Sequence, residues 1–140
     1  MDFVLDASIA LSWCFPDESN AYADRVLDAI GPMLAVVPSI WVYEIANAML
    51  VAQRRARITE EHWNKVANML NALPIRTQDV TFSNTLTTIT AQAKALDLTV
   101  YDAAYLDLAV RMGKPLATAD RRLQEAANRM GVAEFDPGSE

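Results

Sequence analysis

The stretch Phe3-Val4-Leu5-Asp6-Ala7-Ser8 decides the fold, because it predicts a short buried strand that ends at an acid and leads into a helix. Two later apolar runs, at residues 34–37 and 116–117, are also expected to be strands, and helical patterns follow both of them. Strands that alternate with helices indicate a parallel sheet with helices on both faces. We therefore expect an α/β fold.

The remaining elements are predicted from periodicity and from turn residues. We expect helices at residues 8–15, 19–30, 39–56, 59–73, 83–96, 102–112 and 123–130, and strands at residues 3–5, 34–37, 75–80, 116–117 and 133–135. With 140 residues and no linker, the chain is expected to form one domain, residues 1–135, followed by a short tail, residues 136–140.

The composition excludes several classes of protein. A hydrophobic content of 52% is enough for a substantial core, and a net charge of −6 excludes a protein that coats nucleic acid, though not an enzyme that acts on it. No apolar run reaches the roughly 18 residues of a membrane span, and the N-terminus lacks the basic start of a signal peptide. The single cysteine, Cys14, excludes an internal disulfide, so we expect a cytoplasmic protein.

Glu44 is the most informative residue, because it is the only charged residue between Asp28 and Arg54. It lies in a stretch, residues 39–50, that is apolar nearly all round and is therefore expected to form a buried helix. A carboxylate taken partly out of water needs a cation, a hydrogen-bond donor or a metal ion. Its partner must come from elsewhere in the fold, although Asn47, one turn further on, can hydrogen-bond to it or to a metal-bound water.

Three other acids, Asp6, Asp102 and Asp120, also stand where apolar segments end. Each can be explained as a helix cap or first-turn acid, but capping and metal binding can coexist because a carboxylate has two oxygens. Asp6 and Asp120 follow strands, and binding sites in parallel sheets lie beyond the carboxyl ends of the strands. Together with Glu44, these acids predict one acidic metal site, near which Thr118 could orient Asp120 or contact a phosphate.

Other charged residues are expected to have less specific roles. Asp107 lies about 140° around a helix from Asp102, so we expect it to be solvated or to support the site indirectly. Two groups of cations are expected to aid solubility or, alternatively, to contact phosphate: Arg54, Arg55 and Arg57, and Arg111, Lys114, Arg121 and Arg122. With one histidine, His62, and one cysteine, a zinc site of the usual type is excluded.

Carboxylate ligands favour Mg²⁺ or Mn²⁺, and a carboxylate cluster without a nucleophilic triad is typical of metal-assisted phosphodiester hydrolysis. Two alternatives stay open. One is a phosphoryl-transfer or receiver-like domain with Asp6 as the phosphorylated residue, although Ser8 stands where one such pattern needs a second acid. The other is a catalytically silent binding module whose acidic pocket captures an arginine-rich partner.

Four segments resemble the motifs of PIN-domain ribonucleases, specifically VapC-like toxins of bacterial and archaeal toxin–antitoxin pairs. The segments, in order, are Val4-Leu5-Asp6-Ala7-Ser8, Tyr43-Glu44-Ile45-Ala46-Asn47-Ala48-Met49, Tyr101-Asp102-Ala103-Ala104-Tyr105-Leu106-Asp107-Leu108-Ala109 and Pro115-Leu116-Ala117-Thr118-Ala119-Asp120-Arg121-Arg122-Leu123. They extend over nearly the whole chain and contain all four acids. Asp107 stands where many relatives have a non-acidic residue.

The resemblance implies a PIN-like three-layer sandwich, with a five-stranded parallel sheet of order 3-2-1-4-5 between helices. The residues that it implies as catalytic metal ligands for Mg²⁺ or Mn²⁺ are Asp6, Glu44, Asp102 and Asp120, with Ser8, Asn47 and Thr118 as supporting residues. It also implies cleavage of single-stranded RNA, for example in a tRNA or an rRNA. The implied assembly is a homodimer that binds an antitoxin, whose C-terminal segment lies in an apolar groove and reaches the acids with a basic side chain.

Overall fold

The computed structural model describes residues 1–138 and contains a four-stranded parallel sheet. The strands are β1 (Asp2–Leu5), β2 (Leu34–Pro38), β3 (Ile75–Gln78) and β4 (Leu116–Ala117), in the order β3-β2-β1-β4. β1 is central, with Val4 in register with Val36 on one side and with Leu116 on the other. The predicted α/β class and the order of these four strands are confirmed.

The prediction of a fifth strand at residues 133–135 is wrong, because this segment pairs with β4 through a single residue. Glu134 forms an isolated parallel bridge with Leu116, closed by hydrogen bonds from Leu116 N to Ala133 O (3.0 Å) and from Phe135 N to Leu116 O (2.9 Å). β4 has only two residues and offers no longer edge for pairing. The ring of Phe135 instead stacks on that of Phe3 at 3.9 Å, which holds the segment against β1.

Helices connect the strands close to their predicted positions. They are α1 (Ala7–Cys14), α2 (Ala21–Ala29), α3 (Ile40–Arg54), α4 (Glu60–Ala72), α5 (Phe82–Asn84), α6 (Thr90–Leu96), α7 (Val100–Met112) and α8 (Arg121–Arg129), with a 3₁₀ turn at Pro16–Glu18. The side chains of Asn20, Thr59 and Thr99 each accept a backbone N–H from the first turn of the helix that follows. Of the predicted tail, the structure describes residues 136–138, and residues 139–140 lie outside the described residues.

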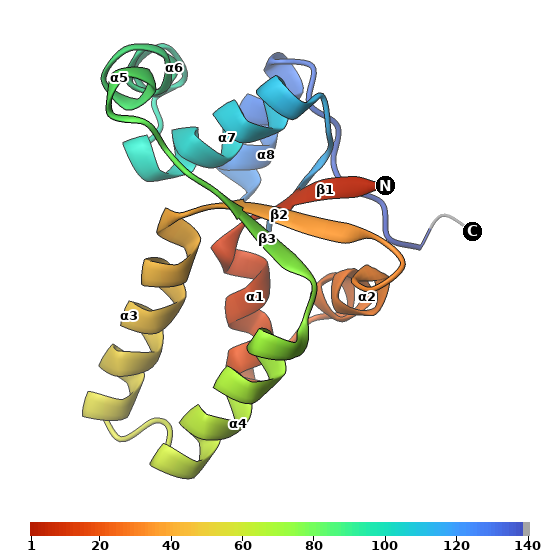
Figure 1. Ribbon diagram of the computed structural model, residues 1–140, viewed down its shortest axis with the longest axis vertical. Helices are drawn as coiled ribbons and strands as arrows, with labels where there is room; N and C mark the ends of the chain where they lie inside the picture. The colour runs from red at the N-terminus through yellow and green to blue at the C-terminus, as the bar shows by residue number, and fades with distance from the viewer. Residues whose placement is uncertain (139–140) are drawn as a thin grey trace.

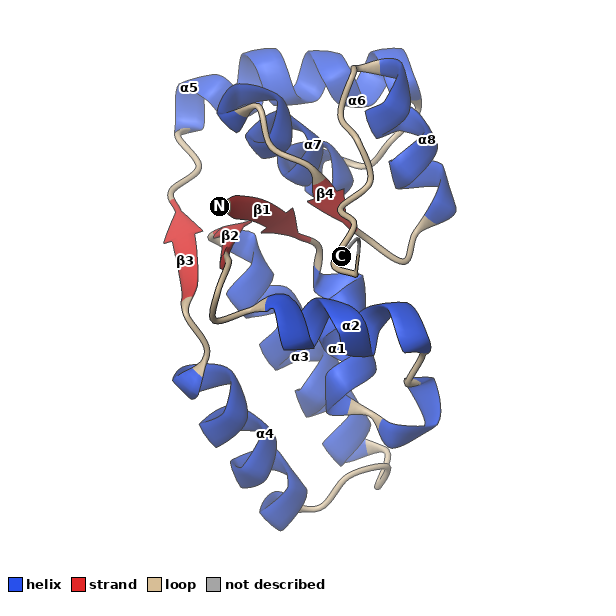
Figure 2. Cartoon of the chain, turned by 90° about the vertical axis from the view of Figure 1, so that its right-hand side faces the viewer, coloured by secondary structure: helices blue, strands red, loops and turns tan. Residues whose placement is uncertain are grey.

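The helices form two layers around the sheet, as Figure 1 shows: α1 to α4 cover one face and α5 to α8 the other. The view turned by 90° in Figure 2 shows the strands between these two groups. Phe3, Val4 and Leu5 of the central strand are fully buried between the layers. The predicted three-layer sandwich is thus confirmed. Within residues 1–138, none of the helices combines the length and the apolar character that a membrane span needs.

The predicted helix at residues 83–96 is continuous but irregular, because α5 and α6 are joined by a π-helical turn, Thr85–Ile89. The Thr90 hydroxyl donates to the carbonyl of Thr85, five residues earlier, at 2.6 Å. The hydroxyls of Thr85 and Thr87 donate to carbonyls four residues earlier, at 2.7 and 2.8 Å. These side chains compete for helix carbonyls, which accounts for the widened turn.

α3 is not buried all round, which corrects the prediction from its sequence. Trp41, Ile45 and Met49 are buried, and the helix packs against α1. Val42 and Tyr43 on its other side are exposed, by 48% and 78%. One face of α3 therefore belongs to the core and the other is an apolar surface.

Candidate active site

Two of the predicted acids lie at the carboxyl edge of the sheet. Asp6 follows β1 directly, and Asp120 follows β4 after two intervening residues. The N–H of Asp6 donates to the carbonyl of Ala117 at 2.9 Å, which continues the hydrogen bonding between the two strands to their ends. Because β1 and β4 are parallel neighbours, they bring both acids to the same edge, where sites of such sheets lie.

Two hydroxyl groups hold the side chain of Asp6. Ser8 Oγ and Thr118 Oγ1 both donate to Asp6 Oδ2, at 2.6 and 2.7 Å. Each hydroxyl has one proton, so the 3.3 Å contact between the two hydroxyl oxygens is not a further hydrogen bond. The backbone N–H groups of Ala119 and Asp120 donate to these hydroxyls, at 2.9 and 3.0 Å. The carboxylate is therefore fixed through Oδ2, while Oδ1 makes no hydrogen bond within residues 1–138.

Glu44 has a hydrogen-bond partner in Tyr105 of α7, whose hydroxyl donates to Glu44 Oε1. Burial raises the pKa of Glu44, the hydrogen bond from Tyr105 opposes that rise, and the charges of Asp6 and Asp102 add to it. The pKa of the fully buried Tyr105 is raised too, by burial and by its contact with Glu44, so its hydroxyl stays protonated and remains a donor. A neutral donor, rather than a cation, thus meets the half-buried carboxylate.

Asp102 and Asp120 both lie at helix N-termini, as their capping interpretations predict. Asp102 is in the first turn of α7, and its backbone N–H donates to Thr99 Oγ1 at 3.0 Å. Asp120 is the N-cap of α8, where its Oδ1 accepts the N–H groups of Arg122 and Leu123 at 2.9 and 3.3 Å. Its Oδ2 makes no hydrogen bond within residues 1–138. Capping therefore occupies one oxygen of Asp120 and leaves the other available.

The four acids form one electrostatic cluster. Burial raises the pKa of Asp6 despite the hydrogen bonds from Ser8 and Thr118, and the charge of Asp120 raises it further. Burial also raises the pKa of Asp102, and the charges of Asp6 and Asp120 add to that rise. Carboxylates that disfavour one another's charged form favour the binding of a proton or of a cation.

The chemistry of this cluster fits a hard divalent cation, because its side chains offer only carboxylate and hydroxyl oxygens. Within residues 1–138, however, no three carboxylate, imidazole or thiolate side chains are gathered closely enough to hold one ion. Rotation about side-chain torsions is therefore needed before several of these acids can share a ligand.

Two residues that the sequence singled out lie apart from this cluster. Asn47 is exposed on α3, and no hydrogen bond joins it to Glu44 in the described part of the chain. Asp107 is not solvated, which corrects that expectation: it is 1% exposed, accepts a hydrogen bond from Asn84 Nδ2 at 3.1 Å and pairs with Arg111 at 2.8 Å. As expected from its place around the helix, Asp107 points to partners other than the four acids.

Tyr105 is a residue of the site that was not predicted from the sequence. A signal for it exists, because Tyr105 follows Asp102 by three positions and so lies on the same side of a helix. A buried tyrosine also needs a partner for its hydroxyl. Its partner, Glu44, is 61 positions away in the chain, so the pair itself could be recognised only from the fold.

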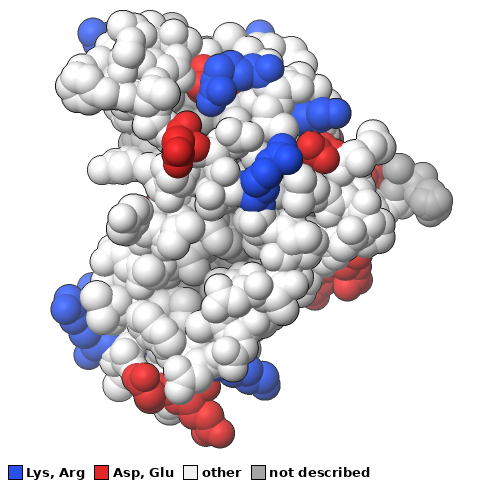
Figure 3. All heavy atoms as spheres, viewed as in Figure 1, with Lys and Arg blue, Asp and Glu red and all other residues white. Residues whose placement is uncertain are grey.

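The surface of the molecule separates charged from uncharged regions. In Figure 3, basic and acidic side chains lie next to one another over the part that α7 and α8 occupy in Figure 1, whereas the middle of the face is largely uncharged. A pocket of about 300 Å³ beside Asp102 and Asp120 also contains Asp97 and Arg122 in its lining. Positive and negative groups therefore lie side by side in the pocket next to Asp102 and Asp120.

Comparisons with known proteins are consistent with this arrangement. Residues 3–129 match the PIN domain family. Ribonuclease VapC3 of Pyrobaculum aerophilum is 30% identical over 132 residues, which cover 89% of this chain and 94% of that protein. The crystal structure of PAE2754 from Pyrobaculum aerophilum matches with a TM-score of 0.64 and 21% identity, over 94% of this chain and 90% of that one.

The crystal structure of FitAcB from Neisseria gonorrhoeae matches over all of both chains, with a TM-score of 0.66 and 19% identity. At these identities the two solved structures support the fold alone. The family match extends over nearly the whole chain and includes the segments around all four acids. This chain therefore belongs to the PIN-domain family and is VapC-like.

Proposed function

We propose that this chain is an endoribonuclease that uses Mg²⁺ or Mn²⁺ and acts as the toxin of a toxin–antitoxin pair. The observation that carries the proposal is the cluster of Asp6, Glu44, Asp102 and Asp120, which come from four separate segments. Burial and the charges of neighbouring acids of this cluster raise the pKa of Asp6, Glu44 and Asp102. Such a cluster suits metal-assisted hydrolysis of phosphodiesters. The relative Ribonuclease VapC3 supports RNA as the substrate.

The fold leaves particular oxygens for a metal ion. Asp6 Oδ1 and Asp120 Oδ2 make no hydrogen bond within residues 1–138, so they are the first candidate ligands. A bound divalent ion would polarise a phosphate oxygen and lower the pKa of a water molecule. Ser8 and Thr118 hold Asp6 in one orientation, and such support of a ligand typically strengthens metal binding.

Glu44 and Asp102 are also candidates for accepting a proton during the reaction. Both carboxyl groups are half-buried with raised pKa values, which makes them better proton acceptors than a solvated carboxylate. We assign to one of them the proton that the attacking water loses, and to both a share in metal binding. Asn47, exposed one turn beyond Glu44, stays a predicted supporting residue.

An apolar groove between α3 and α4 supports a peptide partner. It has a volume of about 340 Å³, and Trp41, Met49, Trp63 and Leu70 are among its lining residues. The buried Trp41 Nε1 has no hydrogen-bond partner within residues 1–138. We expect the C-terminal segment of an antitoxin to lie here, because α3 also carries Glu44 and so connects the groove with the acids.

Exposed apolar side chains support the expected homodimer. Phe82, Leu86 and Tyr101 are exposed by 82%, 60% and 62%, and the segments that carry them pack against one another. Large exposed apolar residues that lie together mark contact surfaces. Cleavage of a tRNA or an rRNA, and a cytoplasmic location, stay predictions.

The experiment that tests the proposed function is RNA cleavage by the protein freed of antitoxin, in Mg²⁺, in Mn²⁺ and in EDTA. Cleavage with either metal and none in EDTA supports the nuclease. No cleavage of any RNA, together with binding of an arginine-rich peptide, supports the silent binding module instead. Trapping of a phosphate on Asp6 would support the phosphoryl-transfer alternative.

A further inference from the structure

Arg122 stands beside two of the proposed metal ligands. It lines a pocket of about 300 Å³ together with Asp97, Asp102 and Asp120, and among residues 1–138 it is the one basic residue of that lining. Its charge reaches the acids, because it lowers the pKa of Asp102 against the larger rise caused by burial and by neighbouring carboxylates. Arg122 is thus part of the electrostatic environment of the cluster.

The contact that holds the guanidinium group of Arg122 is weak. Nη2 donates to the backbone oxygen of Asp97 at 2.8 Å and to its Oδ2 at 3.3 Å. The two side chains are 71% and 99% exposed, so water and salt screen the ion pair. Nε and Nη1 make no hydrogen bond within residues 1–138. The guanidinium can therefore turn to an anion that offers two acceptor oxygens.

The position of Arg122 in its helix is unfavourable for a cation. It lies in the first turn of α8, next to Arg121, where the helix dipole carries a positive partial charge. Stability alone favours an acid there. Asp120 already accepts the N–H groups of Arg122 and Leu123 at this end of the helix, so an anion in the pocket would meet the guanidinium group itself.

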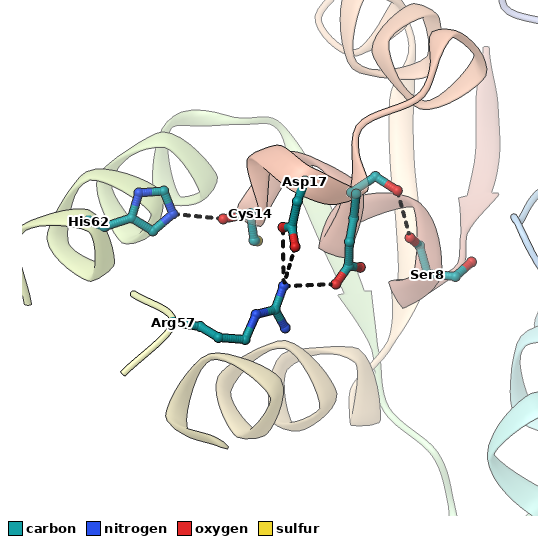
Figure 4. Close-up of polar contacts among 7 residues, drawn as sticks. Ser8, Cys14, Asp17, Arg57 and His62 are labelled. Atoms are coloured by element: carbon teal, nitrogen blue, oxygen red, sulfur yellow. Dashed lines mark hydrogen bonds and ion pairs between the residues drawn. The ribbon is translucent and has the colours of Figure 1, made fainter. Parts of the chain in front are cut away.

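Two other arginines of the predicted cation clusters are engaged with partners of their own. Arg57, in the loop after α3, pairs with Asp17 at 3.1 Å, as Figure 4 shows. It also pairs with Glu18 at 3.2 Å. Arg111 pairs with the buried Asp107. What supports the phosphate-contact interpretation at Arg122 is its place in one pocket lining with Asp102 and Asp120.

We propose that Arg122 binds a phosphate group of the RNA substrate in the pocket that it shares with Asp102 and Asp120. This inference rests on the proposed function and specifies how its substrate is held. Four carboxylates repel a phosphodiester, and a guanidinium at their edge offsets that repulsion and forms paired hydrogen bonds with two phosphate oxygens. When RNA binds, Arg122 exchanges its contact with Asp97 for the phosphate.

RNA binding without cleavage tests the proposal. The protein carries Asp6→Asn, so that bound RNA stays intact, and a labelled single-stranded RNA oligonucleotide is titrated in Mg²⁺ at several salt concentrations. Addition of Arg122→Gln is expected to weaken binding about five- to tenfold and to lower the slope of log K against log salt by about 0.7, the value for one contact on a single strand. Arg129→Gln, in the last turn of the same helix, is the matched control and is expected to change neither.

Two further variants separate phosphate binding from a structural role of the Arg122–Asp97 pair. Arg122→Lys keeps the charge, so it is expected to keep the salt slope while losing part of the affinity. Asp97→Asn releases the guanidinium, so it is expected to preserve or strengthen RNA binding. If Asp97→Asn weakened binding as much as Arg122→Gln, the pair itself would be what matters, and the proposal would be overturned.

Equal affinity and equal salt slope for Arg122→Gln and Arg129→Gln would also overturn it. Thermal melting of every variant checks that the helix is intact, and kcat/KM of the otherwise unchanged enzyme is expected to fall with Arg122→Gln in parallel with RNA affinity. The proposed function fails in a different way, since the protein with all its natural residues would then cut no RNA in Mg²⁺ or Mn²⁺.

Discussion

Thr118 Oγ1 donates a hydrogen bond of 2.7 Å to Asp6 Oδ2, although 112 positions separate the two residues in the chain. Both residues are buried, with 6% and 5% of their surfaces exposed. The contact joins the ends of β1 and β4 through side chains, just beyond the last hydrogen bonds of their backbones. The orientation of the first acid therefore depends on a residue of the fourth matching segment.

Replacement of Thr118 by valine is expected to remove this hydrogen bond. Valine keeps the shape but removes the donor to Asp6 and the acceptor of the Asp120 N–H, which costs about 1–3 kcal/mol for buried groups left unpaired. We expect a fall in melting temperature. We also expect a loss of RNA cleavage of about tenfold or more, the scale on which loss of a residue that orients a metal ligand typically acts. Thr118→Ser retains the hydroxyl, so a serine variant as damaged as the valine variant would contradict this role.

Replacement of Tyr105 by phenylalanine removes the hydrogen bond that lowers the pKa of Glu44. Glu44 then holds its proton to higher pH, so the acidic limb of the pH–rate profile for RNA cleavage is expected to move to higher pH. Tyr101→Phe on the exposed side of α7 is the matched control. Identical pH profiles for the two variants would show that Tyr105 does not govern Glu44.

The fold and the positions of Asp6 and Asp120 could be predicted from the sequence, because short apolar strands followed by acids place those acids at one edge of a parallel sheet. Asp6 and Asp120 are there for that reason. The partner of Glu44 could not be predicted, since Tyr105 lies in another helix. The exposed face of α3 was also unforeseen, because an apolar residue at an interface looks like a core residue in sequence.

The missing fifth strand and the π-helical turn have different causes. Pairing at Glu134 is limited by the two-residue length of β4, and the length of a strand is set by its neighbours as much as by its own sequence. The turn at Thr85–Ile89 depends on which carbonyl groups accept hydrogen bonds from the threonine hydroxyls. The periodicity of apolar residues does not predict these hydrogen bonds. Neither feature changes the positions of Asp6 and Asp120.

The metal-free protein is expected to gain stability when Asp6 is replaced by asparagine. Burial and the nearby Asp120 raise the folded-state pKa of Asp6 above its ordinary value of 3.8, so its ionised form destabilises the fold as the pH rises through that window. Asparagine keeps an oxygen that accepts from Ser8 and Thr118. In EDTA at pH 7.5 we therefore expect Asp6→Asn to melt at a higher temperature than the natural protein.

The same experiment has two internal checks. As the pH falls toward 4, natural Asp6 becomes protonated and the difference between the two proteins is expected to shrink. Addition of Mg²⁺ is expected to raise the melting temperature of the natural protein more than that of Asp6→Asn. A difference that stays constant from pH 7.5 to pH 4 would contradict the raised pKa of Asp6.

Removal of Arg111 is expected to affect stability but not chemistry. Without Arg111, the buried Asp107 would keep only its hydrogen bond from Asn84. An uncompensated buried charge lowers the free energy of unfolding by about 3–5 kcal/mol. This range is an upper bound here, because Arg111 is itself half exposed. Arg111→Ala should therefore melt well below the natural protein, while Arg129→Ala should not. At temperatures where both are folded, RNA cleavage by Arg111→Ala should equal that of the control, and a specific loss of cleavage would place Asp107 in the site.

The central claim is that the four acids form a metal-dependent nuclease site. The most direct test compares RNA cleavage by the natural protein with cleavage by Asp6→Asn and by Glu44→Gln. Each protein is assayed in Mg²⁺ and in EDTA, and the new RNA ends are analysed. The natural protein is expected to cleave RNA in Mg²⁺ and not in EDTA. Because the attacking oxygen comes from water, the products are expected to lack 2′,3′-cyclic phosphate ends. Both variants are expected to lose at least a hundredfold in cleavage rate, which corresponds to roughly 2.7 kcal/mol. Cleavage that survives EDTA or both substitutions, or that leaves cyclic phosphate ends, would contradict it.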